Sequence, residues 1–476
     1  MKITVTRMLV RSLYISLFLL GSLASTCSVA TDINTYQTQL DSLDKAHQTF
    51  SKDFYKKIIK TPALQDARFN SIGALSQAVQ RANKNNSPVK AIALILRNEF
   101  LLSRDYDDPK VISLVKAVLD NNALPSANKL IKNINRQGDD NVNTQLNYLL
   151  ADFYFQREDW QEVLTYLDDS MSKLPLTHYH HALLIKGISL QKQGEHQASI
   201  KAYVKIPVTA KDYIAAQFNI ALANIRQGWW TDGHQLISQL LASEQAENQE
   251  KTLNRLYITL GYSLLNQAYY RNARKTFQSV GLTSRYSNQA LLGIALTAAH
   301  QDDYIGALNA TRFLKNKTGD DLNIDEAYLL MPFFYEKSQQ LATASLGYSQ
   351  ASTYYQNKII ALTQLINTPI NFNKSPITLK NGAIMTIENT YVDFLTEYPQ
   401  YFFVQRHNAS QYKTQLAGLN TPKLSRDLIT LTKEYDELTA KMAKSIMQNR
   451  VAQLNSYLNQ SRYGLARLYD NNTVEQ

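Results

Sequence analysis

Three histidines stand close together in the first half of the chain, at positions His178, His180 and His181. Imidazole is a common metal ligand, but a zinc site needs three or four ligands in register, and usually a carboxylate that orients the imidazole. The sequence places no carboxylate beside these histidines. We therefore assign them to an inter-repeat loop and the first turn of a helix, and we predict neither a metal ion nor another cofactor.

A second run of metal-ligand types lies between Asp320 and Asp325 and resembles the start of a calcium-binding loop. Such a loop requires a glycine after Asp325, which is missing, and Pro332 stands where the closing glutamate belongs. Helix capping by Asn323 or Asp325 explains the run better, since short polar side chains accept hydrogen bonds from the first free N–H groups of a helix.

No catalytic motif accompanies these two runs. The sequence contains no GxSxG, no HExxH and no glycine-rich phosphate-binding run. Basic residues are spread along the chain and do not alternate with aromatic residues, which argues against a nucleic-acid partner. We predict that the protein is not an enzyme, and the sequence singles out no catalytic residue.

The elements that position any binding residues should be helices. Among 476 residues there are only 16 glycines and 11 prolines, and 44% of residues are hydrophobic. This composition favours a helical protein over a β protein with many turns. Because a single core rarely grows to this length, several domains or an extended solenoid are expected.

The N-terminus is typical of a signal peptide. Lys2, Arg7 and Arg11 precede an apolar stretch over residues 13–23, and small residues lead up to Ala30. We predict cleavage after Ala30, export to the bacterial periplasm, and no transmembrane span in the mature chain, because no stretch is long and apolar enough.

Cys27, the only cysteine, leaves an alternative open. The residues before it resemble a lipoprotein motif, although Thr26 is a poor residue at its last position. Cleavage after Ala30 would remove this cysteine together with three positive charges, which lowers the formal net charge from +10 to +7. A positive balance suits anionic neighbours such as acidic glycans or acidic protein surfaces, or it has no specific meaning.

From residue 147 onward, the sequence repeats a pattern of two amphipathic helices. A small or compact residue marks the first helix of each pair, at Ala151, Gly187, Ala221, Gly261, Ala295 and Pro332. Their separations are 36, 34, 40, 34 and 37 residues, close to the period of about 34 in tetratricopeptide repeats (TPRs). These six units resemble the TPR superfamily, and residues 111–135 resemble it weakly.

Two helices can approach closely only where side chains are small, so we expect the helices of one pair to meet at Gly261 and Ala273. Turns are expected at Gly194 and Gly228. The long separation before Gly261 is assigned to a polar loop over residues 244–250, and Pro332 should make its helix kink or begin nearby.

After residue 366 the pattern changes. Residues 378–384 fit either a small hairpin with its turn at Asn381-Gly382 or a loop that leads into a helix. A helix over residues 384–395 is predicted next, followed by a helix over 401–416. Pro422 opens the longest predicted helix, whose apolar residues follow a heptad-like spacing. The closing run over residues 458–469 is similar to the tail of exported repeat proteins of Gram-negative bacteria.

The predicted fold class is therefore all-α: a TPR-like right-handed α-solenoid with an irregular N-terminal layer and a coiled-coil-like C-terminal tail. The predicted divisions are a signal peptide (1–30), an irregular helical region (31–145), a TPR array (146–366) and a helical tail (367–476) with one long helix over 422–470.

The resemblance implies that the first helices line a concave groove that holds a peptide or a helix. Packing of several of these residues against the tail or the N-terminal layer is the alternative. The residues at groove positions are Tyr148, Asp152, Phe155, Leu184, Ile188, Phe218, Arg226, Arg255, Tyr262, Asn266, His300, Glu326, Phe333 and Lys337.

The predicted function is a periplasmic scaffold that binds another envelope protein, in assembly, secretion or cell-wall synthesis. The alternative is a protein that binds anionic glycan or peptidoglycan, including a glycan-processing enzyme, suggested by the positive charge and 29 tyrosines. One residue of the Trp229-Trp230 pair, which lies in a predicted turn, could also be exposed as an anchor.

Overall fold

A computed structural model describes residues 36–474 apart from 62–63, 65–66, 86, 168, 244–249, 318–320, 370–376, 380–382, 388–389, 394–399 and 418. The predicted signal peptide, Cys27 and almost all of the predicted 244–250 loop lie outside the described residues. Contacts divide the chain into two compact units. The first unit holds Gln37–Leu236 and Tyr398–Thr439, and the second holds Ile237–Glu397 and Ala440–Gln476.

The first unit begins with a helix over residues 36–58. Helices α3 (Ile72–Lys84), α4 (Pro88–Arg97), α5 (Glu99–Arg104), α6 (Pro109–Asp120) and α7 (Leu124–Gln137) follow. Then come the pairs α8 (Asp140–Gln156) with α9 (Trp160–Tyr166), α10 (Leu176–Lys192) with α11 (His196–Tyr203), and α12 (Tyr213–Arg226) with α13 (Trp230–Leu241). The short 3-10 helix η1 (Asp169–Lys173) follows α9, and α13 belongs to this unit up to Leu236. Helix α21 (Gln400–Leu416) also belongs to this unit.

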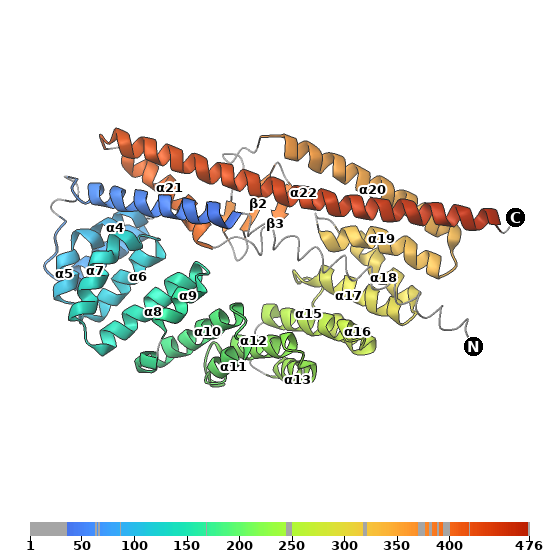
Figure 1. Ribbon diagram of the computed structural model, residues 1–476, viewed down its shortest axis with the longest axis horizontal. Helices are drawn as coiled ribbons and strands as arrows, with labels where there is room; N and C mark the ends of the chain where they lie inside the picture. The colour runs from blue at the N-terminus through green and yellow to red at the C-terminus, as the bar shows by residue number, and fades with distance from the viewer. Residues whose placement is uncertain are drawn as a thin grey trace. The chain divides into compact units, whose positions relative to one another are not determined.

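The second unit continues the series of pairs. They are α15 (Glu250–Asn266) with α16 (Tyr270–Gln278), α17 (Ser287–His300) with α18 (Tyr304–Lys315), and α19 (Leu322–Lys337) with α20 (Leu341–Asn367). Helix α22 (Pro422–Val474) contributes residues up to Thr439 to the first unit and the remainder to the second. Figure 1 shows the paired helices of each unit side by side.

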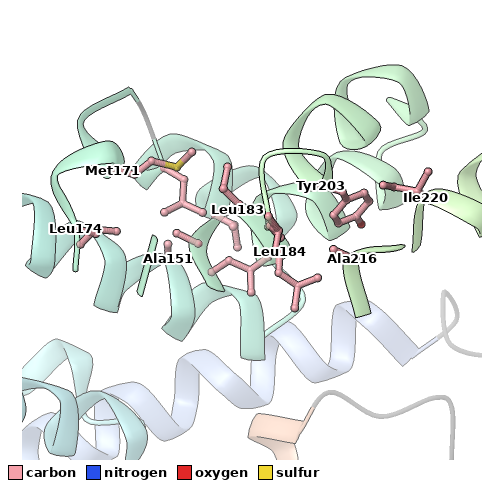
Figure 2. Packing of buried hydrophobic residues seen from close by; sticks show 13 residues of the cluster. Ala151, Met171, Leu174, Leu183, Leu184, Tyr203, Ala216 and Ile220 are labelled. Atoms are coloured by element: carbon pink, nitrogen blue, oxygen red, sulfur yellow. The ribbon is translucent and has the colours of Figure 1, made fainter. Parts of the chain in front are cut away.

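The six predicted pairs are all present, and their stacking confirms a TPR-like helical solenoid. Within each unit the second helix of one pair packs on the first helix of the next, as α11 does on α12 and α18 on α19. In the first unit this stacking encloses a continuous apolar core around Ala151, Leu183 and Tyr203 (Figure 2). Each fully buried aliphatic side chain in such a core stabilises the fold by about 1.5–3 kcal/mol.

Seven turns between paired helices share one geometry. In each turn one residue takes a φ between 56° and 86°, and the next N–H donates to the carbonyl oxygen five residues earlier, which is the Schellman arrangement. The seven residues are Asn122, Glu158, Gly194, Gly228, Ala268, Asp302 and Gln339, and no other described residue has a positive φ. Since Asn122 lies 36 residues before Glu158, α6 and α7 form a further pair in register with the six predicted ones.

Small residues allow the predicted close approach of helices. A Cβ atom added at Gly261 would lie 2.5 Å from the Phe277 ring of α16, and one added at Gly293 of α17 would also lie 2.5 Å from that ring. Phe277 therefore fills a space between two first helices. Gly187 accommodates Tyr203 in the same manner, 2.3 Å from the nearest ring atom.

Pro332 lies inside α19, which begins ten residues earlier at Leu322. Of the two predicted alternatives, a helix start near Pro332 is therefore wrong, and the kink stays a prediction. An aspartate cap starts this helix instead. The compact proline ring faces Gly347 of α20, where an added Cβ atom would lie 2.9 Å from the proline Cβ. Pro332 thus occupies the contact point that small residues occupy in the other first helices.

The predicted helix over residues 384–395 is also wrong. Strands β1 (Ile377–Leu379), β2 (Ala383–Ile387) and β3 (Thr390–Asp393) form an antiparallel sheet in the order β1-β2-β3. Thr378 pairs with Ile384, and Met385 pairs with Val392. The turn residues Asn381 and Gly382 lie outside the described residues. Short apolar runs do not distinguish a strand from a helix by periodicity alone, which explains the error.

Two helices of the tail agree with the sequence: α21 covers the predicted 401–416 helix, and α22 is a single helix of 53 residues. The coiled-coil-like packing of the tail stays a prediction. Leu424, Leu428, Leu431 and Leu438 are buried, as the heptad-like spacing predicts. No helix in the described part of the chain combines the length and the apolar character that crossing a membrane requires.

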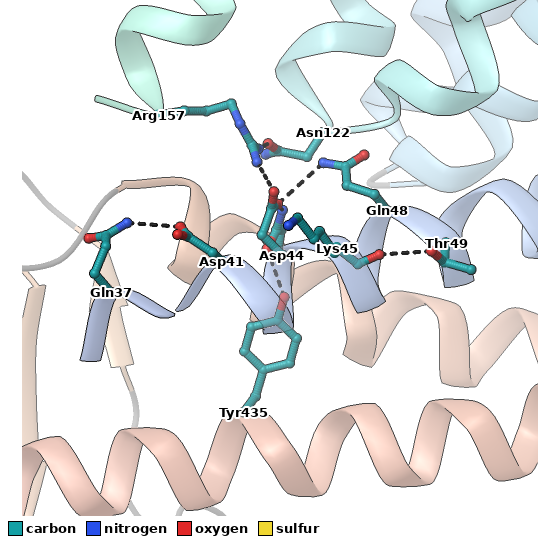
Figure 3. A network of polar contacts seen from close by, with 10 residues as sticks. Gln37, Asp41, Asp44, Lys45, Gln48, Thr49, Asn122, Arg157 and Tyr435 are labelled. Atoms are coloured by element: carbon teal, nitrogen blue, oxygen red, sulfur yellow. Dashed lines mark hydrogen bonds and ion pairs between the residues drawn. The ribbon is translucent and has the colours of Figure 1, made fainter. Parts of the chain in front are cut away.

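In the first unit, an acidic side chain holds helix 36–58 to its neighbours. Asp44 accepts hydrogen bonds from Arg157, next to the α8–α9 turn, and from Gln405 of α21 (2.6 Å). Gln405 in turn accepts a 2.7 Å hydrogen bond from the Tyr435 hydroxyl of α22. Figure 3 shows Arg157 and Gln48 directed toward the same carboxylate.

The second unit has a comparable contact between α19, α20 and the C-terminal half of α22. Asp325 is fully buried and lies 2.8 Å from Lys358 and 2.5 Å from Arg450. The Tyr354 hydroxyl donates a 2.6 Å hydrogen bond to the same carboxylate. Farther along α22, Arg467 donates to both carboxylate oxygens of Glu336, at 2.5 and 2.6 Å.

Candidate functional site

An imidazole and two carboxylates meet on the first helices of three successive pairs. The Nε2 atom of His181, in the second turn of α10, lies 3.7 Å from an oxygen of Asp152 of α8. Its Nδ1 atom lies 3.7 Å from an oxygen of Asp212, the residue before α12. Tyr148 lies one turn before Asp152 on α8, and its ring stacks on His178 at 4.9 Å and meets His181 edge-on at 6.2 Å. We call these five residues the His181 cluster.

The local sequence explains why these side chains share one face. Residues four apart on a helix lie one above the other, so Tyr148 and Asp152 point the same way. His178 and His181 are three apart and do the same on α10. Stacking of successive pairs then places the α8 residues opposite those of α10. The side chains remain partly exposed, with His181 at 35% and Asp152 and Asp212 at 19% each.

The charges of the His181 cluster are coupled. The hydrogen bond to Asp152 raises the pKa of His181 against the effect of burial, and the charge of Asp212 adds to the increase. Burial raises the pKa of Tyr148, so its hydroxyl stays protonated at neutral pH. With His181 protonated the cluster carries a net charge of about −1, and with His181 neutral about −2. The cluster therefore favours a positively charged or hydrogen-bond-donating ligand.

None of the described residues forms a group of three or more His, Cys, Asp or Glu side chains arranged to hold a metal ion. The acidic run near residue 321 has a structural role instead. Asp321 caps α19 by accepting a 2.8 Å hydrogen bond from the Asn323 N–H, so the predicted capping by Asn323 or Asp325 is wrong. Asp325 is the buried carboxylate that holds Lys358 and Arg450.

Two of the seven groove positions predicted in the first unit, Tyr148 and Asp152, belong to the His181 cluster. Phe155 is partly buried against the core and meets the Trp160 ring edge-on at 5.7 Å. Phe218 is 6% exposed and lies in the core, and Arg226, the last residue of α12, is exposed. Of the two apolar positions, Leu184 is buried and Ile188 packs against the same core.

The groove positions predicted in the second unit do not form one cluster. Arg255, Asn266 and Lys337 are exposed, and Lys337 lies over the Phe333 ring at 5.4 Å. The remaining three are partly buried: Tyr262 donates a 2.9 Å hydrogen bond to the Gln289 carbonyl, His300 stacks on Tyr270 at 4.4 Å, and burial raises the pKa of Glu326 to about 7.

His181 and Asp212 are absent from the predicted groove set. A signal was present, since aromatic and acidic residues at i and i+4 on α8 are followed by His178 and His181 on the next first helix. This signal can be recognised only when it is known which residues of one helix pair lie beside which residues of the next. Trp229 and Trp230, at the start of α13, are 44% and 36% exposed, so both rings of the predicted pair reach the surface.

The chain matches no protein-family model and no curated protein by sequence. Among solved structures it is similar to the apo form of RapI, with 13% identity, coverage of 78% of this chain and 98% of that chain, and a TM-score of 0.42. A signal-transduction ATPase with a tetratricopeptide repeat sensor from Pyrococcus horikoshii gives 14% identity, 63% and 52% coverage and a TM-score of 0.40. The TPR domain of P58(IPK) gives 13% identity, 68% and 93% coverage and a TM-score of 0.21. These similarities concern the fold, which is TPR-like.

Proposed function

We propose that the protein is a non-catalytic scaffold of the bacterial cell envelope that binds a segment of another protein on the first-helix face of the first unit. The His181 cluster carries this proposal, because it gathers partly exposed charged and aromatic side chains from three successive first helices. Aromatic side chains beside charged groups are typical of surfaces that hold peptides.

The negative net charge of the His181 cluster indicates what kind of side chain the partner presents. Two carboxylates around one imidazole attract a lysine or arginine side chain, and the Tyr148 ring offers a face on which such a cation can lie. Removal of the carboxylate charges should weaken binding, whereas removal of an exposed charge elsewhere should not. Binding should also weaken with salt, because partly exposed charges are screened.

The test is affinity capture from envelope extracts with the immobilised mature chain, in the wild type and in the double variant Asp152→Asn with Asp212→Asn. Asp232→Asn on α13 removes one exposed carboxylate from a second helix of the same unit and serves as the matched control. We expect partners that the wild type and the control retain and the double variant loses. Equal recovery by all three proteins would contradict the proposal.

Export is the second part of the proposal and is supported by the first 30 residues alone. Mass spectrometry of the protein purified from its native host should find an N-terminus at Thr31. A lipid-modified Cys27 would change the mode of attachment and keep the envelope location. A full-length chain in the cytoplasmic fraction would contradict export.

Glycan binding is a second candidate, favoured by the exposed Trp229 and Trp230 rings. Aromatic rings of this kind can stack on the apolar faces of sugars. Sedimentation with purified cell wall tests this candidate. Wild-type protein in the pellet, and its loss on Trp229→Ala with Trp230→Ala, would favour the glycan over the protein partner. Wild-type protein that stays in the supernatant would remove this candidate.

A further inference from the structure

His47, on helix 36–58, is buried completely and makes no hydrogen bond. Neither of its ring nitrogens has a partner, so a neutral ring leaves one N–H and one lone pair unsatisfied. An unsatisfied buried polar group costs about 1–3 kcal/mol, and a buried charge without a partner costs more. Burial at this position therefore costs more free energy when the His47 imidazole is protonated than when it is neutral.

The elements packed around His47 present aromatic rings rather than acceptors. The Tyr412 ring of α21 lies 6.0 Å away and the Tyr435 ring of α22 lies 6.4 Å away, edge-on. The charged groups that act on it are Asp44 on its own helix, which favours the protonated form, and Arg157 from the α8–α9 turn, which opposes it. These two charges oppose each other, and burial lowers the pKa of His47 to about 4.

His47 lies at one end of an aromatic cluster that joins helix 36–58 to α21. Tyr412 is at its centre, 4.6 Å from Phe54 and 5.5 Å from Phe50. The Tyr412 hydroxyl also lies 3.4 Å from the Ser51 hydroxyl. Apart from Asp44 and Arg157, the residues named around His47 are uncharged, so His47 can change its charge while the surrounding apolar contacts stay the same.

We propose that His47 makes the docking of helix 36–58 on α21 and α22 sensitive to acid, so that protonation of its imidazole releases this helix from the first unit. The released helix would expose the Phe50, Phe54 and Tyr412 rings. This inference concerns an N-terminal contact and does not depend on what the His181 cluster binds.

The sign follows from proton binding. In the released helix His47 has its ordinary pKa of 6.5, and in the docked helix its pKa is about 4. Between these values the released form binds more protons, so acid favours release. Lowering the pH from 7.5 to 5 should increase the open population of helix 36–58 by about 30-fold, and most exposed carboxylates remain ionised at pH 5.

Hydrogen–deuterium exchange of the full mature chain tests the proposal, with rates corrected for the intrinsic effect of pH. Peptides from residues 36–58 should lose about 30-fold in protection at pH 5, while peptides from α4, which contains no histidine, should keep their protection. His47→Phe should abolish the loss because the ring stays uncharged, and His407→Gln on α21, an exposed position, should respond like the wild type.

Three outcomes would overturn the proposal: unchanged protection of residues 36–58 in the wild type at pH 5, an equal loss in α4, or an equal acid response in His47→Phe. If His47→Phe does not fold, His47→Leu provides the same test with a smaller apolar side chain.

Discussion

Each unit secures a sequence-distant helix through one acidic side chain, but the two contacts differ in how completely they are enclosed. In the second unit Asp325 has no exposed surface and is surrounded by Lys358, Arg450 and the Tyr354 hydroxyl. In the first unit the Asp44 side chain is 17% exposed and is bound by Arg157, Gln405 and Gln48. The buried Asp325 carboxylate thus binds two cations, whereas the partly exposed Asp44 carboxylate binds one cation and two neutral amides.

The difference shows how burial changes the consequence of losing a charge. A buried ion pair adds little stability over an apolar replacement, yet removal of one partner is severe because the other charge remains buried. Removal of Asp325 leaves two such cations, Lys358 and Arg450, whereas removal of Asp44 leaves one, Arg157. The Asp325 contact should therefore be the stronger constraint on α22, and the Asp44 contact the more adaptable one.

The largest effect is expected for Asp325→Ala. The substitution leaves Lys358 and Arg450 mostly buried without a counter-charge, so the second unit should lose about 3–5 kcal/mol. Urea unfolding followed by circular dichroism and by tryptophan fluorescence measures this selectively, because Trp160, Trp229 and Trp230 all lie in the first unit and the chain has three tryptophans. An unchanged dichroism transition would show that Asp325 does not hold α22.

The next effect is a pH dependence of opposite sign in the two units. His47 has a lowered pKa, so the first unit should lose stability as the pH falls from 6.5 to 4, by roughly 3 kcal/mol. Burial raises the pKa of Glu326 to about 7, so the second unit should lose stability as the pH rises from 4.5 to 7, by a smaller amount because this side chain is partly exposed. Hydrogen–deuterium exchange read separately for each unit checks both slopes, and parallel slopes would contradict the comparison.

Asp44→Ala should destabilise the first unit by about 2 kcal/mol, less than the loss at Asp325. The lower value follows from the number of cations left without a counter-charge, since removal of Asp44 leaves Arg157 alone, whereas removal of Asp325 leaves both Lys358 and Arg450. Tryptophan fluorescence during urea unfolding measures the change. A loss larger than that of Asp325→Ala would reverse the order proposed for the two contacts.

The smallest change in stability is expected for substitutions at the positive-φ residues of the turns between paired helices. In the second unit Ala268, Asp302 and Gln339 carry side chains at positive φ, whereas two turns of the first unit use Gly194 and Gly228. Ala268→Gly should stabilise the second unit by about 0.5–1 kcal/mol, because glycine adopts this conformation without steric cost. Gly194→Ala should destabilise the first unit by a similar amount. The midpoint of urea unfolding detects both, and the same sign for the two variants would be inconsistent with this explanation.

Much of the repeat fold is predictable because close helix packing needs small residues at a regular spacing. Gly187 and Gly261 mark their helices in the sequence, and the structure places a ring against each. The sheet over residues 377–393 could not be predicted, since Ile384 and Tyr391 fit helical spacing as well as strand alternation. Asp325 carries no local signal either, because its partner Lys358 lies 33 residues away.

The candidate site was predictable only in part. Tyr148 and Asp152 share a helix face that the repeat pattern identifies. His181 and Asp212 come close to these two residues because successive helix pairs stack on one another. The sequence pattern within a single pair does not predict how the next pair is rotated against it. For the same reason Phe218, at a groove position by pattern, lies in the core.

The central claim is that the first-helix face around the His181 cluster binds another protein of the envelope. Crosslinking in living cells, with a photoreactive amino acid in place of Tyr148, tests this claim most directly, and the same probe in place of Gln161, an exposed residue of α9, serves as the control. We predict a crosslinked envelope protein from position 148 that is missing from position 161 and is lost when Asp152 and Asp212 are changed to asparagine. No crosslinked protein from position 148, or the same products from both positions, would contradict the account.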